Sequence, residues 1–395
     1  MLRGSKGKKR DAERSPVSEL SDDLLVEIIS RVPYKSTRCC KCVCQRWRDL
    51  VTHLDHRKKL PWSTLAGFFY QICKRTSNPQ MDRGYQSLAG NWCPHIDPSL
   101  PFLPRCEGRD IIELLDCCNG LLLCQRSKQE DTYTTKMILD YVVCNPATEQ
   151  WVSVPATEWS GKALNVRLGF DPAFSSHFHV FEFAPIGVVD AEYSGDTGHI
   201  KAVGIYSSKG RAWTRRSAWD CPIKILYTSS SSAFFNGVMY SISYDDMVVA
   251  VIDVEGNCRV IPTPTPHDVG VRSNVYLARG QLYLARYYDS QLSVWALEDC
   301  SSEDWILKHN VSQMQLFRKE YSSNVWMYNV IIHPEENVIF MQFSISYQSP
   351  HHSVNKLVSY EMDSRELRFI RDLEWGCVAP YLPYVPFFES LEDGH

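Results

Sequence analysis

NGLLLCQ (Asn119–Gln125) and YVVCNPATEQWVSVP (Tyr141–Pro155) are the two stretches that decide the fold. Both contain short apolar runs bounded by turn-forming residues, which is the pattern of β-strands. The first stretch reads as a strand led by glycine. The second reads as a strand, a polar turn and a further strand opened by Trp151. Together they predict three antiparallel strands of one sheet.

The same order of strands and turns recurs along the chain. Its further copies are Phe178–Pro185 with Val203–Arg216, Phe235–Tyr244 with Val249–Pro264, Arg279–Tyr288 with Leu292–Asn310, and Asn337–Ile345 with Leu357–Ile370. The copies lie roughly 45 to 60 residues apart, which suits a propeller blade of four antiparallel strands. The third strand of each unit opens at or near one large side chain, namely Trp151, Trp213, Arg259, Trp305 or Arg365. An aromatic ring at this place is suited to packing between neighbouring blades.

The number of repeats favours a propeller over a β-sandwich, which needs no such regular spacing. The interval from about Trp62 to Cys118 has room for one more, degenerate blade. We therefore predict that residues 60–395 form a mostly antiparallel β-propeller of five or six blades, with six favoured. With the helices described next, the expected class is an α+β protein of more than one domain.

Residues 18–56 have helical instead of strand periodicity. Six apolar residues draw one stripe along the first helix: Leu20, Leu24, Leu25, Ile28, Ile29 and Val32. Ser21 is a suitable N-cap, and Pro33 ends the helix. Beyond it, Cys40, Val43, Cys44, Trp47 and Leu50 recur at threes and fours, which fits one or two short helices. Three short helices cannot bury much core alone, so this apolar face needs a partner.

Four cysteines, Cys39, Cys40, Cys42 and Cys44, crowd the second helical stretch. A zinc site needs four ligands that converge tetrahedrally. Cys40 and Cys44 share a helix face, but the other two point elsewhere. We therefore predict that these cysteines are packing residues and that no metal is bound.

Composition limits the classes of function. The chain has 395 residues, 44% of them apolar, and a formal net charge of −4, which disfavours nucleic acid as a partner. Only residues 1–17 are locally basic, and we expect them to be a disordered tail. No apolar run is long enough for a membrane helix and no secretory signal is present, so we expect no membrane partner and a place in the cytoplasm, the nucleus or both. The 15 cysteines are then expected to be mostly buried thiols.

No arrangement of residues indicates catalysis, and we expect no cofactor. Ser207–Gly210 is G-x-S-like but falls in a predicted turn, without the strand-to-helix elbow that a serine hydrolase needs. His177 with His179, His351 with His352, and Asp245 with Asp246 are more simply explained as core or solvated residues than as metal ligands. Aromatic residues in or near predicted loops favour a protein-binding face instead: Trp159, Tyr193, Trp219, Tyr244, Tyr287, Tyr288 and Trp326. The substrate-binding residues remain unknown at this level.

Two parts of the chain resemble a known family. LSDDLLVEIISRVPYKSTRCCKCVCQRWRDLV (Leu20–Val51) resembles a plant F-box, in which Cys42 and Cys44 stand where the family itself carries cysteine. LLDCCNGLLLCQ, YVVCNPATEQWVSVP, LGFDPAFSSHFHVFEF and LVSYEMDSRELRFI look like the F-box-associated region of the same proteins, which is similar to kelch-type propellers. Together the two resemblances span most of the chain.

The resemblance implies a function without catalysis. An F-box docks on a Skp-type adaptor and through it on a cullin, and the propeller would then capture an unknown protein substrate for ubiquitination. The implied adaptor-binding residues are Leu20, Leu24, Leu25, Ile28, Ile29, Val32, Pro33, Val43 and Trp47. Departures from the family pattern at Ser21, Thr37, Arg38 and Cys40 would weaken this contact.

Two alternatives stay open. The chain can be a kelch-like propeller that binds a glycan or acts as an enzyme, with the helices as a cap. It can also be an adaptor-bound protein that never joins a ligase.

Overall fold

A computed structural model of the chain divides into two compact units, Met1–Ser63 and Thr64–His395, which we call the helical unit and the propeller unit. The residues that the structure describes are 16–32, 34–57, 59–60, 64–74, 80–88, 96–104, 111–129, 137–160, 163, 165–185, 200–217, 232–243, 248–264, 272–299, 303–317, 325–346, 353–373 and 377–391. Most of the predicted basic tail, together with Pro33, Tyr193, Trp219, Tyr244, Asp245, Asp246, His351 and His352, lies outside these residues. Within them, no helix is long and apolar enough to cross a membrane.

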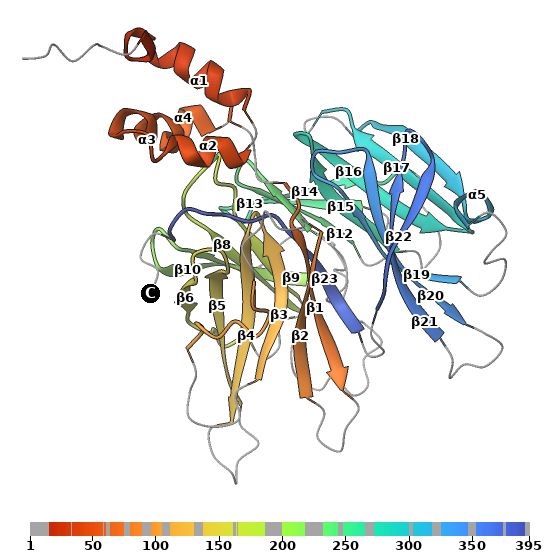
Figure 1. The fold of residues 1–395 in the computed structure, drawn as a ribbon. Helices are drawn as coiled ribbons and strands as arrows, with labels where there is room; N and C mark the ends of the chain where they lie inside the picture. The colour runs from red at the N-terminus through yellow and green to blue at the C-terminus, as the bar shows by residue number, and fades with distance from the viewer. Residues whose placement is uncertain are drawn as a thin grey trace, which may run out of the picture. The chain divides into compact units, whose positions relative to one another are not determined.

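The helical unit consists of short helices (Figure 1). Their bounds are η1 (Pro16–Glu19), α1 (Asp22–Ser30), α2 (Tyr34–Cys40), α3 (Gln45–Thr52) and α4 (Leu54–Arg57). Of the two arrangements left open for the second helical stretch, the structure has separate helices α2 and α3, with a turn between them. The last residues of the predicted tail belong to η1.

Helix α1 begins as its sequence predicts. The Ser21 hydroxyl accepts a hydrogen bond from the backbone N–H of Leu24, at 3.4 Å, so the predicted N-cap is confirmed. Asp22 and Asp23 occupy the first turn, where the helix dipole favours negative charge. The last helical residue is Ser30, and Arg31 closes the helix.

The core of the helical unit lies between α1 and α3. Leu25 and Val26 pack with Leu50, with Leu20 and Trp47 at the margin. Ile29 packs with Val51 and Leu60, and Trp47 also borders this second cluster. One apolar side of α1 is therefore buried by the unit itself.

The predicted packing role of the crowded cysteines is wrong for three of the four. Only Cys40 packs against the core, beside Ile29, and it is partly buried. Cys42 and Cys44 are exposed because α2 ends at Cys40 and the turn that follows breaks the helical stripe. Cys39 lies within α2 and is also exposed. The nine cysteines whose side chains the structure describes are free thiols, and of these only Cys124 and Cys144 are fully buried, so the expectation of mostly buried thiols was too strong.

The propeller unit has six sheets, so the favoured blade number is confirmed. Blade 1 contains β1 (Gly67–Lys74), β2 (Gln80–Ser87) and β23 (Cys377–Tyr384). Blade 2 contains β3 (Ile111–Cys118), β4 (Leu121–Gln129), β5 (Met137–Asn145) and β6 (Gln150–Val154). Blade 3 contains β7 (Asn165–Gly169), β8 (His179–Pro185), β9 (Ile200–Ser207) and β10 (Ala212–Ser217). Blade 4 contains β11 (Ser232–Phe235), β12 (Val238–Ile242), β13 (Val248–Asp253) and β14 (Cys258–Pro262). Blade 5 contains β15 (Arg272–Ala278), β16 (Gln281–Tyr288), β17 (Gln291–Leu297) and β18 (Trp305–Ser312). After α5 (Gln313–Phe317), blade 6 contains β19 (Val325–Ile332), β20 (Val338–Ser346), β21 (Ser353–Glu361) and β22 (Glu366–Leu373).

Strands within each sheet are antiparallel, and blades 2 to 6 are meanders of four consecutive strands. The glycine-led strand of each repeat is the second strand of its blade and not the first. The residue expected to open a third strand is therefore on the fourth: Trp151, Trp213 and Trp305 lie in β6, β10 and β18, and Arg259 lies in β14. Arg365 stands in the turn just before β22, with a positive φ of 57°.

Blade 1 closes the ring with strands from both ends of the propeller unit. Strand β1 pairs with β2 on one side and with β23 on the other, and Figure 1 shows orange β1 beside blue β23. The degenerate blade expected between Trp62 and Cys118 is thus present only in part, and the last strand of the chain completes it.

Neighbouring blades are joined by apolar clusters, one at each boundary from blade 1 to blade 5. The largest cluster joins blades 5, 6 and 1, and contains Phe68, Val294 and Phe343. The tryptophans of the outer strands take part in this packing, as their spacing predicts. Trp213 borders the cluster between blades 2 and 3, and Trp305 borders the one between blades 4 and 5.

Candidate functional site

Helix α1 carries more apolar surface than the helical unit can bury. At about 100° per residue, its apolar side chains from Leu24 to Val26 cover an arc of about 200°, whereas one helix contact needs about half of that. Leu25 and Ile29, each 1% exposed, are the buried members of the predicted stripe, and Val26, which was not part of that stripe, is buried beside them. Leu24 and Ile28, one turn apart, are 54% and 48% exposed and form the other half.

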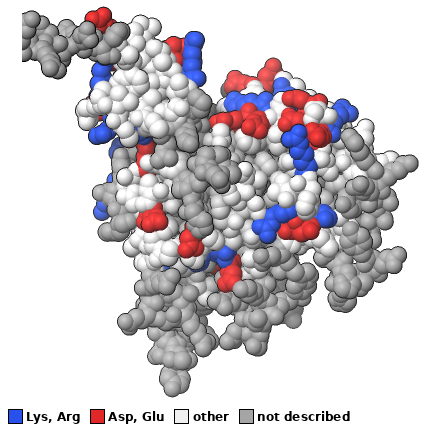
Figure 2. Space-filling view, in the orientation of Figure 1, with Lys and Arg blue, Asp and Glu red and all other residues white. Residues whose placement is uncertain are grey.

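The remaining predicted adaptor-binding residues divide in the same way. Val43 is 61% exposed in the turn after α2, whereas Leu20, Val32 and Trp47 are partly buried. We call Leu24, Ile28 and Val43 the exposed apolar set. Leu25 and Ile29 belong to the interior and can affect a contact surface only by shaping it. In the view of Figure 2, the helical unit shows a broad area without charged side chains, with acidic and basic side chains at its margins.

Arg46 fixes the start of α1 against α3. Its Nε donates to the Asp22 carboxylate at 2.8 Å, and one terminal nitrogen donates to the backbone carbonyl of Leu20 at 2.6 Å. Both contacts act on the first turn of α1, directly before Leu24. These two contacts tie the first turn of α1, next to Leu24, to α3.

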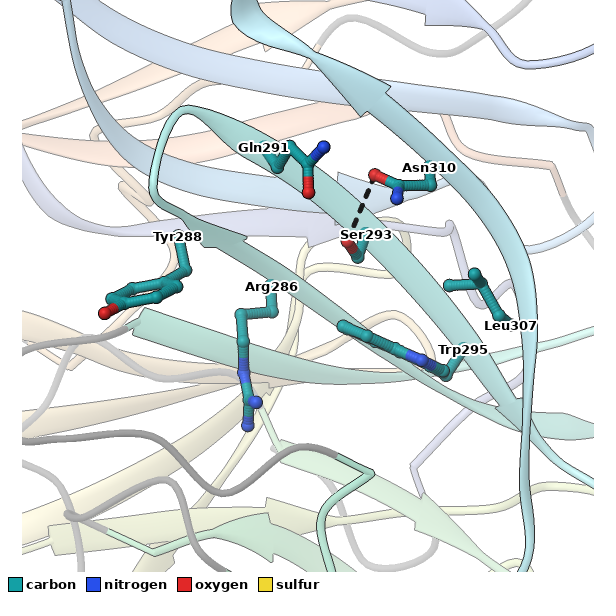
Figure 3. A pocket seen from close by; sticks show the side chains of 7 residues that line it. All are labelled: Arg286, Tyr288, Gln291, Ser293, Trp295, Leu307 and Asn310. Atoms are coloured by element: carbon teal, nitrogen blue, oxygen red, sulfur yellow. Dashed lines mark hydrogen bonds between the residues drawn. The ribbon is translucent and has the colours of Figure 1, made fainter.

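The propeller unit has a pocket of about 290 Å³ on blade 5. Its lining residues come from three adjacent strands and are Arg286, Tyr288, Gln291, Ser293, Trp295, Leu307 and Asn310 (Figure 3). Of these, only Tyr288 was among the aromatic residues selected from the sequence. The rest were missed because none of them belongs to a recognisable motif.

A polar row forms the floor of the pocket. Ser273, Arg286, Ser293 and Asn310 are direct cross-strand partners on β15, β16, β17 and β18. The Ser293 hydroxyl donates to Asn310 Oδ1 at 3.3 Å, and Arg286 Nε donates to the Ser273 hydroxyl at 2.7 Å. Each of the four strands therefore contributes one polar residue to a row in register. Ser273 and Arg286, the two buried members, satisfy each other by this hydrogen bond, whereas Ser293 is partly buried and Asn310 is exposed.

Apolar side chains border the polar row. Trp295 and Leu307 are cross-strand partners, and Figure 3 shows Trp295 between Arg286 and Leu307. The guanidinium carbon of Arg286 lies 5.8 Å from the centre of the Trp295 ring, within the range of a cation–π contact. On the other side, Tyr288 and Gln291 are paired across the β16–β17 turn. The pocket thus combines two side-chain amides, a hydroxyl and an aromatic wall.

Residues considered for catalysis lie elsewhere. Ser207 ends β9, and Ser208–Gly210 form the turn that leads to β10, as predicted. His179 opens β8 between Phe181 and Phe234, and burial, with a smaller contribution from the charge of His177, lowers its pKa to about 4. Within the described ranges, no cluster of three or more histidine, cysteine or acidic residues can hold a metal ion.

Other selected aromatic residues have structural surroundings. Tyr287 donates its hydroxyl to Gln313 and borders the cluster of blades 5, 6 and 1. The Arg215 guanidinium lies 4.8 Å from the centre of the Trp159 ring and pairs with Glu158. Trp326 lies in β19, and its side chain is outside the described set.

The most strongly perturbed groups are buried inside the blades and not in the pocket. Burial raises the pKa of Cys117 and of Cys118, and the charge of Asp116 raises both further. Burial also raises the pKa of Tyr141, whose hydroxyl donates to Glu182 at 2.9 Å. These groups stay protonated at neutral pH, so the thiols lack the thiolate form that a nucleophile needs.

Comparisons with known proteins match both units. Residues 17–59 match the F-box domain, and residues 98–379 match a family described as F-box protein At3g26010-like, beta-propeller. F-box protein At5g07610 of Arabidopsis thaliana is 26% identical over 307 residues, which are 73% of this chain and 70% of the relative. A relative from the same plant named as an F-box/kelch-repeat protein, At1g15680, is 24% identical over 357 residues, 81% of this chain and 78% of its own. A solved structure of TolB from Acinetobacter baumannii covers 87% of this chain and 73% of its own, with a TM-score of 0.47 and 11% identity.

Proposed function

Because this chain belongs to the family of F-box proteins with an At3g26010-like β-propeller, we propose that it is the substrate-recognition subunit of a Skp-cullin-F-box ubiquitin ligase. In this role the helical unit binds a Skp-type adaptor and through it a cullin. The propeller unit binds a target protein. The chain supplies no reacting group; it raises the effective concentration of the target near the ubiquitin-carrying enzyme.

The exposed half of the α1 stripe is the observation that carries this proposal. Leu24 and Ile28 lie one turn apart, half exposed, on a helix whose other apolar side is already buried by α3. Exposed apolar side chains that cluster at this spacing are typical of a helix face that docks on another protein. Val43 adds a further exposed apolar side chain, from the turn between α2 and α3.

Finer parts of the proposal rest on the family alone. The kelch likeness is supported by one relative with that name. A place in the cytoplasm, the nucleus or both follows from the proposed ligase role, and fluorescence microscopy of the tagged chain tests it.

In Figure 2, acidic and basic side chains alternate on the visible face of the propeller unit, which offers nucleic acid no broad basic surface there.

Co-purification with a Skp-type adaptor tests the proposal. We expect Leu24→Asp with Ile28→Asp to abolish capture of the adaptor, because two carboxylates would have to be desolvated at the contact. Phe369→Asp is the matched control, because Phe369 is 58% exposed on β22 of blade 6. Undiminished capture by the double variant, with both variants equally folded, would refute the proposed contact. Probing the same complex for cullin separates a ligase subunit from an adaptor-bound protein outside any ligase.

A further inference from the structure

We propose that the pocket on blade 5 is the place where the propeller unit takes hold of its target, and that it binds an extended peptide segment with a central apolar side chain. This inference rests on the proposed function for the identity of the ligand class. The lining residues themselves are Tyr288, Gln291, Ser293, Trp295, Leu307 and Asn310, with Arg286 behind them.

The polar groups of the pocket suit a peptide main chain. Gln291 and Asn310 each carry a side-chain amide, which has donor and acceptor atoms like those of the peptide bond. Asn310 uses Oδ1 to accept from Ser293, which leaves Nδ2 to donate to a ligand carbonyl. Figure 3 shows Gln291 next to the Ser293–Asn310 pair, so both amides lie at one end of the pocket.

The apolar wall suits one aliphatic or aromatic side chain of that peptide. Leu307 is 50% exposed although it pairs across the strands with Trp295. Arg286 is a positioning residue here: its Nε is held by Ser273, and its guanidinium lies over the Trp295 ring. A volume of about 290 Å³ has room for one or two side chains and not for a folded domain.

A second feature beside the pocket favours an extended peptide over a sugar. Strand β18 carries Leu307 and Asn310 and is the outermost strand of its sheet; among the described strands, only β17 pairs with it. An outer strand has backbone groups that can pair with an added strand, and alternate side chains of that strand then reach neighbouring pockets.

A library of labelled nonapeptides with a fixed central Leu, Phe, Gly, Asp or Lys tests the inference on the full chain. We expect central Leu and Phe to bind at least about tenfold more tightly than central Gly or Asp, the size of effect that one buried apolar contact supports. Leu307→Asp should abolish this preference. Asn310→Ala should weaken all peptides by a similar factor and leave the preference in place, because it removes a main-chain contact.

Ile306→Asp is the matched control, because Ile306 is the neighbour of Leu307 on the same strand, is 40% exposed, and does not line the pocket. It should change binding less than about twofold. Unfolding midpoints of all three variants exclude misfolding as the cause of any loss. Equal binding of all central residues, or a preference that survives Leu307→Asp, would overturn the inference. So would binding to a glycan array that Leu307→Asp or Asn310→Ala abolishes.

Measuring adaptor capture distinguishes a failure of the proposed peptide site from a failure of the proposed ligase role. Leu307→Asp and Asn310→Ala should leave capture of the Skp-type adaptor unchanged, since neither belongs to the helical unit. Loss of peptide preference with intact adaptor capture supports the pocket alone. Failure of adaptor capture by the unmodified chain would refute the ligase role without touching the peptide result.

Discussion

The indole Nε1 of Trp213 donates a hydrogen bond to the carbonyl oxygen of Pro155, at 2.8 Å, across the boundary between blades 3 and 2. Trp305 makes the same bond to Pro262, also at 2.8 Å, between blades 5 and 4. In both cases the tryptophan opens an outer strand, and the proline ends or follows the outer strand of the preceding blade. At two of the five repeat positions, the residue singled out in the sequence thus makes a hydrogen bond between blades.

Replacing Trp213 by Phe should lower the free energy of unfolding by about 1 kcal/mol, because the ring packing remains while the indole donor is lost. Trp305→Phe should have an effect of the same size. Urea denaturation followed by circular dichroism measures both. If neither variant differs from the unmodified chain, these bonds add nothing to the cohesion of the ring.

Substitutions at three glycines distinguish the free-energy cost of backbone strain from that of steric crowding. Gly120 has a φ of 89°, and a Cβ placed there would lie 2.5 Å from Phe387 Cβ and from the Phe387 backbone nitrogen. Gly280 has a φ of 73° but nothing within 4 Å, and Gly210 has neither constraint. We expect Gly210→Ala to be neutral, Gly280→Ala to cost about 1 kcal/mol, and Gly120→Ala to cost clearly more. Equal unfolding midpoints for the Gly120 and Gly280 variants would show that the segment after β23, which contains Phe387, shifts away from the added methyl group at little cost in free energy.

The two halves of the α1 stripe should respond differently to truncation. Leu25→Ala removes a buried side chain and should destabilise the helical unit by about 2–4 kcal/mol. Leu24→Ala should change stability by less than about 0.5 kcal/mol, because Leu24 is exposed. Limited proteolysis and thermal denaturation distinguish them. A large loss of stability from Leu24→Ala would place that side chain in an interior contact instead.

Stability should fall as the pH is lowered from about 6.5 to about 4, in part because of His179. Its folded pKa is lowered to about 4 by burial, so the unfolded chain takes up a proton at a higher pH than the folded chain does. The stabilisation from the neutral ring is therefore present above pH 6.5 and is lost toward pH 4. The shift corresponds to at most about 3 kcal/mol.

His179→Phe should flatten this pH dependence, since a phenyl ring fits beside Phe181 and Phe234 and does not titrate. Burial also lowers the pKa of His309 and of His333, so part of the slope should persist in the variant. Denaturation at pH 7.5, 6 and 5 gives the difference. Parallel pH profiles for the two proteins would exclude a contribution from His179.

Local sequence signals predicted much of the propeller. Apolar runs bounded by turn residues predicted the later strands of each blade. Asn119–Gly120 and Asn236–Gly237 form two-residue hairpin turns with positive φ at both positions, although in the sequence they indicated only the start of a strand. The first strand of each blade was harder to find. β11 has only four residues, too few to show a period of two, whereas β3, β15 and β19 have seven or eight but precede the residue at which each repeat begins in the sequence pattern.

Pairing between distant residues could not be predicted. The partner of β1 in the closing blade is β23, at the far end of the chain, and no local pattern indicates that pairing. The pocket depends on the alignment of Ser273, Arg286, Ser293 and Asn310, whose unequal separations become one row only once the strand register is known. On α1, periodicity identified an apolar stripe but could not tell Leu24 from Leu25, since both halves of the stripe are equally apolar.

The strand that seals blade 1 is the last of the described strands to be synthesised. Until β23 has left the ribosome, β1 lacks one of its two neighbours and the ring is open. Folding of the propeller unit therefore cannot finish before β23 has emerged, and apolar blade faces stay exposed until then. A nascent chain truncated before Cys377 would be a client for chaperones and not a smaller working receptor.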